Sequence, residues 1–394
     1  MIYLHVPFCG SFCTYCDFYS EICRSRQVFN EYADAVIAEI RDRRKELEMN
    51  MSAQDAVNTL YIGGGTPSVL PLDVLSRIVG AVSQTERLSL VTEQLSLVTE
   101  PVEVTTPTEL FDEFTVEVNP EDIVEKGREY VRGLLALGVN RISMGIQSFN
   151  DDILRWMNRR HDAGNAVKAF HILRESGVRN ISIDLIFGIS QLTDETWKDT
   201  IEKALELSPE HISAYQLSIE EGSALAKMVA DGRYVEASDE QCRRQYDILC
   251  RCLGRSGYHH YEISNFAKPG FEAVHNSAYW RRAPYIGLGP GAHSLTGNVR
   301  SWNSQELPHR SPDGSSATYS RTSETLSPED IRVERIMLSL RTDKGLKATE
   351  LYSLTDSTVV DALLSEGALE RHGASIRIPE DHLFTSDEII RELI

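Results

Sequence analysis

Residues 5–18 read HVPFCGSFCTYCDF and hold three cysteines, Cys9, Cys13 and Cys16, in the spacing C-x3-C-x2-C. The short apolar segment before them, residues 2–6, predicts a β-strand. Three thiolates this close together can hold one soft metal centre, and cysteine sulfur is the usual ligand of iron–sulfur clusters. A cluster of four irons held by three cysteines leaves one iron open to a further ligand. The loop therefore predicts an iron–sulfur site directly after the first strand.

A zinc site and incidental buried cysteines both fit this loop less well. A structural zinc site normally has four protein ligands, and a catalytic one uses histidine and carboxylate. Incidental cysteines would not be expected in this spacing directly after a strand.

The other four cysteines need no cluster. Cys242 shares a helical core stripe with Tyr246, Leu249 and Leu253, where a free cysteine behaves as a small hydrophobe. We expect structural roles for the remaining three, which are Cys23, Cys250 and Cys252. Seven cysteines do not make a disulfide scaffold. A three-thiolate site needs reduced thiols, which favours a cytoplasmic location.

The composition limits the partners that the protein can have. The chain has 394 residues and a formal charge of −19, which argues against nucleic acid and against a general attraction to anionic membranes. There is no apolar stretch of transmembrane length, and the first strand begins so early that we expect no signal peptide. Peripheral contact with a membrane stays open.

Short β-branched segments alternate with amphipathic segments over the first half of the chain. The expected strands are 2–6, 58–62, 114–118, 140–146, 180–187 and 211–217. The expected helices are about 28–48, 72–85, 121–137, 164–176 and 194–207. Repeated strand–helix units predict a parallel sheet, and six of them predict an α/β barrel or partial barrel. Such folds place their chemistry at the carboxyl ends of the strands.

The last quarter of the chain has a different composition. Residues 301–328 are rich in Ser, Thr, Pro and Gly, which predicts a linker. Residues 329–394 predict a compact, winged-helix-like domain, with a helix over 329–341, two shorter helices, a hairpin formed by 375–378 and 382–385, and a terminal helix. Its eight basic and 14 acidic residues give a net charge of −6, which favours a packing module or lid over DNA binding.

We therefore divide the chain into a core barrel (1–225), a barrel extension (226–300), a linker (301–328) and a C-terminal helical domain (329–394). Residues 88–94 recur almost unchanged as 95–101. Two copies do not make a solenoid, so we expect a local duplication in a surface connection.

Glycines follow the second expected strand in the segment YIGGGTP, residues 61–67. Such a run lets the backbone approach a ligand and exposes its amides, although many such runs only form tight turns. Other strand-end segments are VEVNP (116–120), RISMGIQSF (141–149) and IDLIFG (183–188). Together with the cysteine loop, these segments resemble the oxygen-independent coproporphyrinogen oxidase-like family of radical S-adenosylmethionine (SAM) proteins.

The resemblance covers residues 1 to about 300 and, more loosely, the C-terminal domain. It implies a radical-SAM partial (β/α)6 TIM-like barrel, a [4Fe-4S] cluster on Cys9, Cys13 and Cys16, and SAM at the open iron. It also implies SAM contacts from Tyr3, Tyr15, Gly64, Gly65, Thr66, Glu117, Gln147, Arg159 and Asp184. The chemistry is suitable, because carboxylates accept from hydroxyl or amino groups and arginine pairs with a carboxylate. Any one of these residues alone could be a satisfied polar residue at a strand end, and the ordered set favours contact.

Two features distinguish the branches of this family. The decarboxylating oxidases carry a fourth cysteine two residues after the third, where this chain has Phe18. Residues 275–280, HNSAYW, form an HNxxYW motif that resembles the signature of the heme chaperone branch. A neutral imidazole can ligate heme iron, and aromatic rings can cover a porphyrin. We expect heme contacts from His275, Asn276, Tyr279 and Trp280, with His293 as a second candidate. A structural cluster of histidine and aromatic side chains is the alternative.

The resulting hypothesis is a heme chaperone that holds a [4Fe-4S] cluster, SAM and one heme, and transfers heme to an acceptor protein. The first alternative is an enzyme, oxygen-independent coproporphyrinogen III oxidase, which forms protoporphyrinogen IX in porphyrin biosynthesis. Two further alternatives are a radical-SAM enzyme acting on another tetrapyrrole and a zinc-binding structural module. The sequence does not name the acceptor or decide whether SAM is cleaved, and so whether the protein is an enzyme.

Overall fold

A curved nine-stranded sheet forms the centre of the molecule. The computed structural model describes residues 1–53, 55–94, 111–307 and 319–394, without the side chains of 85–94. In sheet order the strands are β11 (Ile286–Leu288), β1 (Ile2–Val6), β4 (Thr59–Gly64), β5 (Glu113–Val118), β6 (Arg141–Gln147), β7 (Asn180–Phe187), β8 (His211–Gln216), β10 (Asn265–Ala267) and β9 (His259–Glu262). The strands from β11 to β8 pair in parallel, whereas β10 pairs antiparallel with both β8 and β9.

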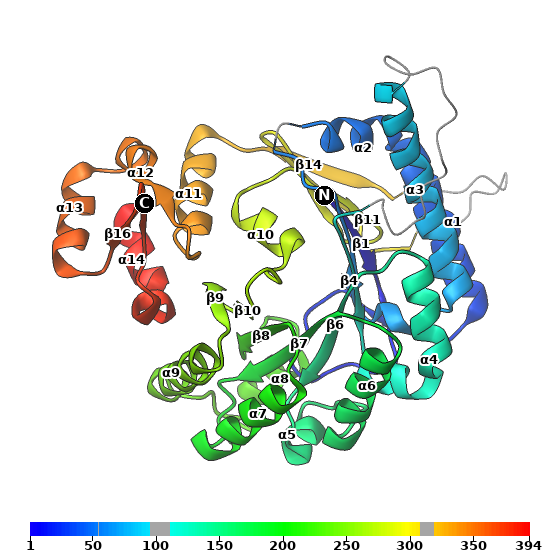
Figure 1. Cartoon of the computed structure of the whole chain (residues 1–394), viewed down its shortest axis with the longest axis horizontal. Coiled ribbons are helices and arrows are strands. Elements are labelled where there is room, and N and C mark those ends of the chain that lie inside the picture. Colours follow the sequence, from blue (N-terminus) through cyan, green and yellow to red (C-terminus); the bar gives the residue numbers. More distant parts are fainter. Residues whose placement is uncertain (54, 95–110, 308–318) are drawn as a thin grey trace.

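Helices cover the convex face of this sheet (Figure 1). They include α1 (Arg26–Asp42), α3 (Leu72–Gln94), α4 (Pro120–Ala136), α6 (Ala163–Glu175) and α7 (Asp194–Leu207), with α9 (Asp239–Arg255) beside β9. The shorter helices are α2 (Arg44–Met51), α5 (Asp151–Trp156), α8 (Ala224–Ala230), α10 (Val274–Trp280) and the 3-10 turn η1 (Pro67–Val69). Of these, α10 lies on the concave side of the sheet. The expected α/β fold with parallel strands and covering helices is confirmed.

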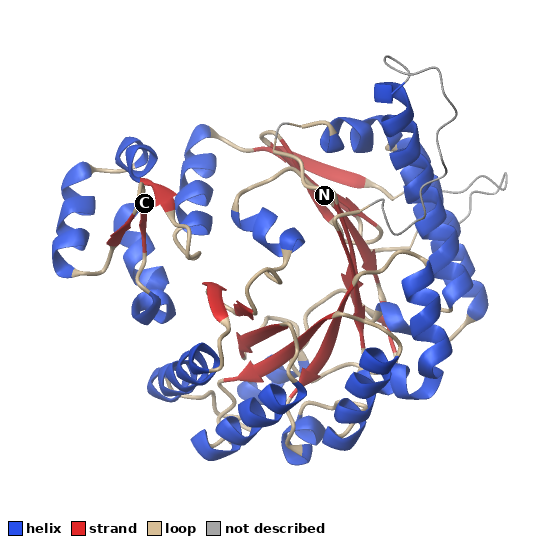
Figure 2. Cartoon of the chain, viewed as in Figure 1, coloured by secondary structure: helices blue, strands red, loops and turns tan. Residues whose placement is uncertain are grey.

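Alternation along the strands explains why the two faces of the sheet differ. Ile142 and Met144 of β6 belong to the apolar core beneath the helices, whereas Arg141 and Ser143 line the cavity on the concave side. Strands β5, β7 and β8 follow the same rule. Because side chains alternate between faces, each strand supplies an apolar row to the core and a polar row to the interior. The described sheet keeps β11 and β9 as edges, so it is an open, curved sheet (Figure 2).

The helix expected over 28–48 is divided in two. Helix α1 ends at Asp42 and α2 begins at Arg44, because Arg43 leaves the helical conformation. The buried Arg43 guanidinium donates to Glu39, to Glu46 and to the carbonyl of Gly287 on β11. This tertiary bonding overrides the helical periodicity of the local sequence.

The repeat at 88–101 is also placed differently from the expectation. Helix α3 runs to Gln94, so the first copy, 88–94, is helical rather than part of a connection. The second copy, 95–101, lies outside the described residues.

Strands occupy both ends of the segment expected as a linker. Strands β12 (His293–Thr296), β13 (Val299–Asn303) and β14 (Arg321–Thr325) form an antiparallel sheet. Cross-strand pairs such as Arg300 with Glu324 support strands here despite the polar composition. The Ser/Pro/Gly-rich residues 308–318 lie outside the described residues.

The C-terminal residues form a small helical domain with a three-stranded sheet. Its elements are α11 (Pro328–Ser339), β15 (Leu346–Lys347), α12 (Ala348–Leu354), α13 (Ser357–Glu366), β16 (Glu370–His372), β17 (Ser375–Arg377), η3 (Glu380–Thr385) and α14 (Ser386–Leu393). The expected hairpin between 375–378 and 382–385 is wrong, because the first of these segments pairs with the strand before it. Strand β17 pairs with β16 across a turn at Gly373, which has φ +58°, and residues 380–385 form a 3-10 helix after Pro379. No helix in the described part of the chain is long and apolar enough to span a membrane.

Candidate functional site

A cavity of about 870 Å³ lies on the concave side of the sheet, at the carboxyl ends of its parallel strands. Its walls come from the central strands, from the cysteine loop and from α10. All three loop cysteines line it, and so do all nine residues expected to contact SAM. The fold therefore brings these residues, which are spread over residues 3–184, into one space.

The cysteine loop is fixed at both ends. Cys9 lies in β2 (Phe8–Cys9), which pairs with β3 (Glu21–Ile22). The Thr66 hydroxyl donates to Cys9 Sγ at 3.5 Å, and Arg159 Nη1 donates to Cys13 Sγ at 3.3 Å. The Thr14 amide donates to the carbonyl of Met157 at 3.1 Å. The loop thus rests on the segment that follows α5, more than 140 residues later in the chain.

Two thiols of this loop are held in the protonated form by the fold. Burial raises the pKa of Cys16 to about 11 and also raises the pKa of Cys9. A bound iron favours the thiolate, because metal ligation and proton loss are coupled. Cluster loading should therefore release protons from these groups.

Two glycines allow the backbone of β4 to approach the loop closely. Gly64 has φ +110°, and a Cβ there would lie 2.5 Å from the His5 ring. A Cβ on Gly65 would lie 2.8 Å from the carbonyl oxygen of Phe8 and 3.1 Å from Cys9 Sγ. The glycine run is therefore required by close packing against the cysteine loop, as well as being a potential ligand cradle.

Two carboxylates line the cavity from β5 and β7, the strands on either side of β6. Glu117 accepts a hydrogen bond from the Tyr61 hydroxyl at 2.7 Å and another from the Gly64 amide at 3.2 Å. Burial raises the pKa of Glu117 to about 7, although these two donors oppose the rise. Burial also raises the pKa of Asp184, against hydrogen bonds from Ser213 and Ser143. These acids can accept from a cationic amino group or from ribose hydroxyls.

A bulge places Gln147 and the half-buried Arg159 near these acids. The β6–β7 register shifts between Gly145 and Gln147, and Gln147 has φ +68°. Arg159 donates to the Gly145 carbonyl at 2.6 Å and to the Asn119 side chain, while its buried Nε has no partner among the described residues. The strained bulge and the unpaired N–H both favour a ligand-binding role over a purely structural one.

Three of the four heme candidates line the same cavity. His275 is buried, with Nδ1 at 2.7 Å from the Thr59 hydroxyl and Nε2 at 3.1 Å from the Tyr279 hydroxyl. Burial lowers the pKa of His275 to about 3, so the ring is neutral. Asn276 and Tyr279 line the cavity beside it.

The remaining candidates are elsewhere. Trp280 lines a second cavity of about 750 Å³ between the barrel and the C-terminal domain. His275 and Tyr279 are four residues apart and share a helix face, whereas Trp280 is turned about 100° away. His293 is exposed and stacks on Trp302, outside both cavities. The structure therefore does not gather the motif and His293 into one site.

Several cavity residues were missed from the sequence. They include Tyr61, Asn119, Arg141, Ser143, His211 and Ser213. Three of them, Tyr61, Ser143 and Ser213, lie opposite an expected site residue on a neighbouring strand, and Asn119 follows Glu117 by two residues. Polar residues at alternate positions of otherwise apolar strands were the signal that could have found them.

Comparison with known proteins agrees with this geometry. Residues 3–204 match the model of the Radical SAM superfamily. The heme chaperone HemW of Lactococcus lactis is 33% identical over 345 residues, 87% of this chain and 82% of the relative. HemW of Bacillus subtilis is 33% identical over 346 residues, with coverage of 87% and 84%. The coproporphyrinogen III oxidase HemN of Escherichia coli superposes with a TM-score of 0.75, at 21% identity, over 99% of this chain and 89% of that one.

The fold and the matched segment define this chain as a radical SAM protein. Within that superfamily, it belongs to the heme chaperone HemW family. The superfamily implies a [4Fe-4S] cluster and SAM. The residues present fit both groups, because three thiols share one cavity with a glycine cradle and an unpaired buried arginine N–H.

Proposed function

We propose that this protein carries heme and passes it to an acceptor protein, using a site that also holds the [4Fe-4S] cluster and SAM. The observation that carries this proposal is the cavity itself, which is lined both by the cysteine loop and by His275 and Tyr279 of the HNxxYW segment. The similarity to HemW proteins over most of the chain favours the chaperone over the oxidase alternative. The match to HemN, at 21% identity, supports the fold alone.

The proposed roles of the cavity residues follow from their positions. Cys9, Cys13 and Cys16 would hold the cluster, and Arg159 would balance its thiolate charge from 3.3 Å. The methionine end of SAM would lie against Gly64, Gly65 and Thr66, with Glu117, Gln147 and Asp184 available to its polar groups and Tyr3 and Tyr15 flanking it. When reduced, such a cluster can donate an electron to SAM. Phe18 stands where the oxidases place a further cysteine.

His275 is the residue that we propose as a ligand of the heme iron. Its present hydrogen bonds show which contact must be broken before the ring can bind iron. Both ring nitrogens are bonded, Nδ1 to the buried Thr59 and Nε2 to Tyr279. Tyr279 lines the cavity, so moving its hydroxyl aside would free Nε2 as an iron ligand. Tyr279→Phe should therefore keep or raise heme affinity, while His275→Ala should lower it by about tenfold or more.

Titration of the cluster-loaded protein with heme, followed by its visible absorbance, tests this. His293→Ala is the matched control, since His293 lies outside the cavity. Iron content and SAM affinity should stay at the parent value in all three variants. An unchanged heme titration in His275→Ala would contradict the assignment of this histidine.

A second measurement separates the two functional classes. Anaerobic incubation with SAM, a reductant and coproporphyrinogen III should yield no protoporphyrinogen IX, and heme-loaded protein should transfer heme to an apo-heme protein. Robust decarboxylation without transfer would move the assignment to the oxidase. A cytoplasmic location is proposed with this function, and all seven cysteines are free thiols in the structure.

A further inference from the structure

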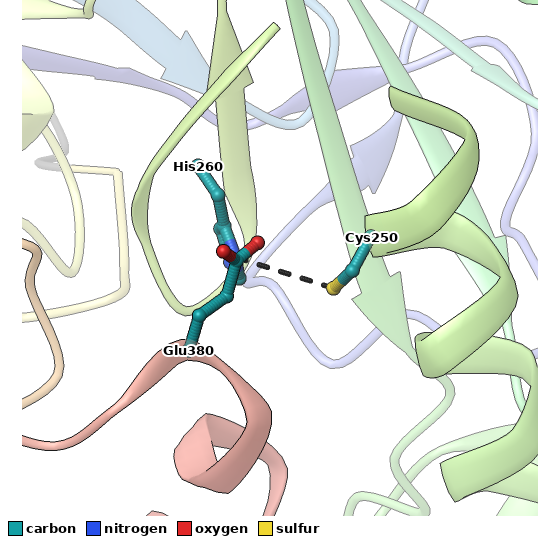
Figure 3. A group of neighbouring side chains, drawn as sticks. All are labelled: Cys250, His260 and Glu380. Atoms are coloured by element: carbon teal, nitrogen blue, oxygen red, sulfur yellow. Dashed lines mark hydrogen bonds and ion pairs between the residues drawn. The ribbon is translucent and has the colours of Figure 1, made fainter. Parts of the chain in front are cut away.

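Three potential metal ligands meet at the contact between the barrel and the C-terminal domain. Cys250 lies on α9, His260 on β9 and Glu380 at the start of η3 (Figure 3). Their ligand atoms all lie within 4.8 Å of one another. Cys250 and Cys252 were expected to be structural, and neither belongs to the SAM cavity.

The distances resemble those between the ligands of one metal ion. Cys250 Sγ lies 4.0 Å from His260 Nδ1, and Glu380 Oε1 lies 3.1 Å from the same nitrogen. Around tetrahedral zinc, with bonds of about 2.3 Å to sulfur and about 2.0 Å to nitrogen or oxygen, the corresponding separations are about 3.5 Å and 3.3 Å. These two observed separations differ from the tetrahedral values by about 0.5 Å and about 0.2 Å.

The other ring nitrogen of His260 has partners that suit the metal-binding tautomer. Nε2 lies 3.4 Å from the Ile263 carbonyl and 3.3 Å from the Tyr246 hydroxyl, and that hydroxyl donates to the same carbonyl at 2.8 Å. Because a carbonyl only accepts, it can take the proton of the tautomer that is protonated on Nε2. In the neutral ring, Nδ1 then presents a lone pair toward a thiol and a carboxylate. This is the orientation in which protein histidines ligate metals.

An ion pair accounts more simply for part of this geometry. A second proton on Nδ1 would let His260 donate to Glu380, and the positive Arg377 also lies near that carboxylate. Arg377 itself donates to Glu370 and to the Asp343 carbonyl. The ion pair does not involve the adjacent Cys250 thiol, which also packs against the apolar core. A metal ion would engage all three groups.

The geometry points to a zinc site formed by Cys250, His260 and Glu380, with solvent in the fourth position. The His260 side chain is only 4% exposed, whereas Glu380 is 61% exposed, so the site is rigid on the barrel side and accessible from the C-terminal side. His260 also stacks on Phe266, with ring centroids 4.1 Å apart. Zinc here would tie η3 to the barrel extension beside the second cavity.

Zinc titration of the full-length, cluster-loaded protein against a chromophoric chelator tests the proposal. We expect one zinc per chain in the parent, and affinity weaker by about tenfold or more in Cys250→Ser and Glu380→Gln, which preserve side-chain size. The matched control is Cys252→Ser, which changes a cysteine on the same helix outside the group. Its zinc binding should equal that of the parent.

Cobalt gives an independent readout of the ligands. Co²⁺ bound in the parent should show a thiolate-to-cobalt absorption band that Cys250→Ser lacks and Cys252→Ser retains. Iron content should be the same in every sample, which excludes exchange at the cysteine loop. Equal zinc affinity in the parent and both ligand variants, or no zinc bound by the parent, would overturn the proposal.

Discussion

Glu117 is the side chain through which pH should act on the SAM site. Burial raises the pKa of its carboxyl to about 7, against the Tyr61 and Gly64 hydrogen bonds. The carboxylate, which accepts from a cationic amino group, forms as pH rises through that value. SAM affinity should therefore strengthen by up to about tenfold between pH 6 and 8. Calorimetric titration across this range, on cluster-loaded protein, measures the effect.

The matched variants are Glu117→Gln, which removes the titration, and Glu125→Gln, which changes an exposed residue of α4. The first should show weak SAM binding that no longer depends on pH in this range. The second should follow the parent. A pH profile shared by all three proteins would show that Glu117 does not contact SAM.

The raised pKa of Glu117 affects stability in the opposite direction, because a rise in pH that strengthens SAM binding should weaken the fold. A buried carboxyl with a pKa of about 7, above the ordinary 4.5, holds a proton in the folded state that the unfolded chain has released. The free energy of unfolding should therefore fall as pH rises from about 4.5 to 7. Urea unfolding should show this loss in the parent and a smaller one in Glu117→Gln. Parallel curves would contradict the raised pKa.

At this scale, the sequence predicted which strand-end residues come together. Each expected SAM residue lies in the cavity because the carboxyl ends of parallel strands meet at one edge of the sheet. Trp280 could not be placed this way, because its direction depends on where α10 begins and how it packs. The two hydrogen bonds of His275 were equally invisible, since Thr59 is 216 residues away in the chain.

Among the elements, the turn after β4 should tolerate no added side chain. In Gly65→Ala, the new Cβ would meet the Phe8 carbonyl at 2.8 Å and Cys9 Sγ at 3.1 Å. Displacing the Cys9 strand should reduce cluster incorporation severalfold, measured as iron and sulfide per chain. Gly80→Ala is the control, because a Cβ there meets nothing within 4 Å and alanine favours the helix. Full cluster content in Gly65→Ala would show that the loop can move.

Elements with strong local patterns were predictable, and those made by distant partners were not. The six expected strands agree closely with β1 and β4 to β8, because buried parallel strands are short β-branched runs. Strands β13 and β14 have polar sequences and exist through cross-strand pairing. The break between α1 and α2 depends on the hydrogen bond from Arg43 to the distant Gly287 carbonyl. The C-terminal hairpin turns at Gly373, and the short polar strand before this turn has no clear strand pattern in the sequence.

For the whole molecule, Glu334 should hold the C-terminal domain against the barrel. On α11, it accepts from Arg282 Nε at 2.7 Å and from Arg300 of β13, and it is largely buried. Burial opposes its ionisation, but these hydrogen bonds leave its pKa below the ordinary value. Glu334→Gln keeps the shape and removes the charge, so that Arg282 loses its carboxylate partner and Arg300 keeps only Glu324.

Hydrogen exchange of the α11 amides measures this. They should exchange faster in Glu334→Gln, because opening of the contact becomes easier. Glu329→Gln is the control on the same helix, since Glu329 pairs only locally with Arg332. Unchanged exchange in the Glu334 variant would place the main attachment elsewhere, for example at the bridge between Glu262 and Thr342.

The anchoring of the cysteine loop has a consequence for biogenesis. The loop comes first in the chain, yet Thr14 and Cys13 are held by Met157 and Arg159. While the protein is being synthesised, the loop lacks these contacts until Met157 and Arg159 have been made and have packed against it. Cluster insertion should thus be a late step of maturation. Premature metal capture by the nascent chain would have to be reversed before the sheet could pack against the loop.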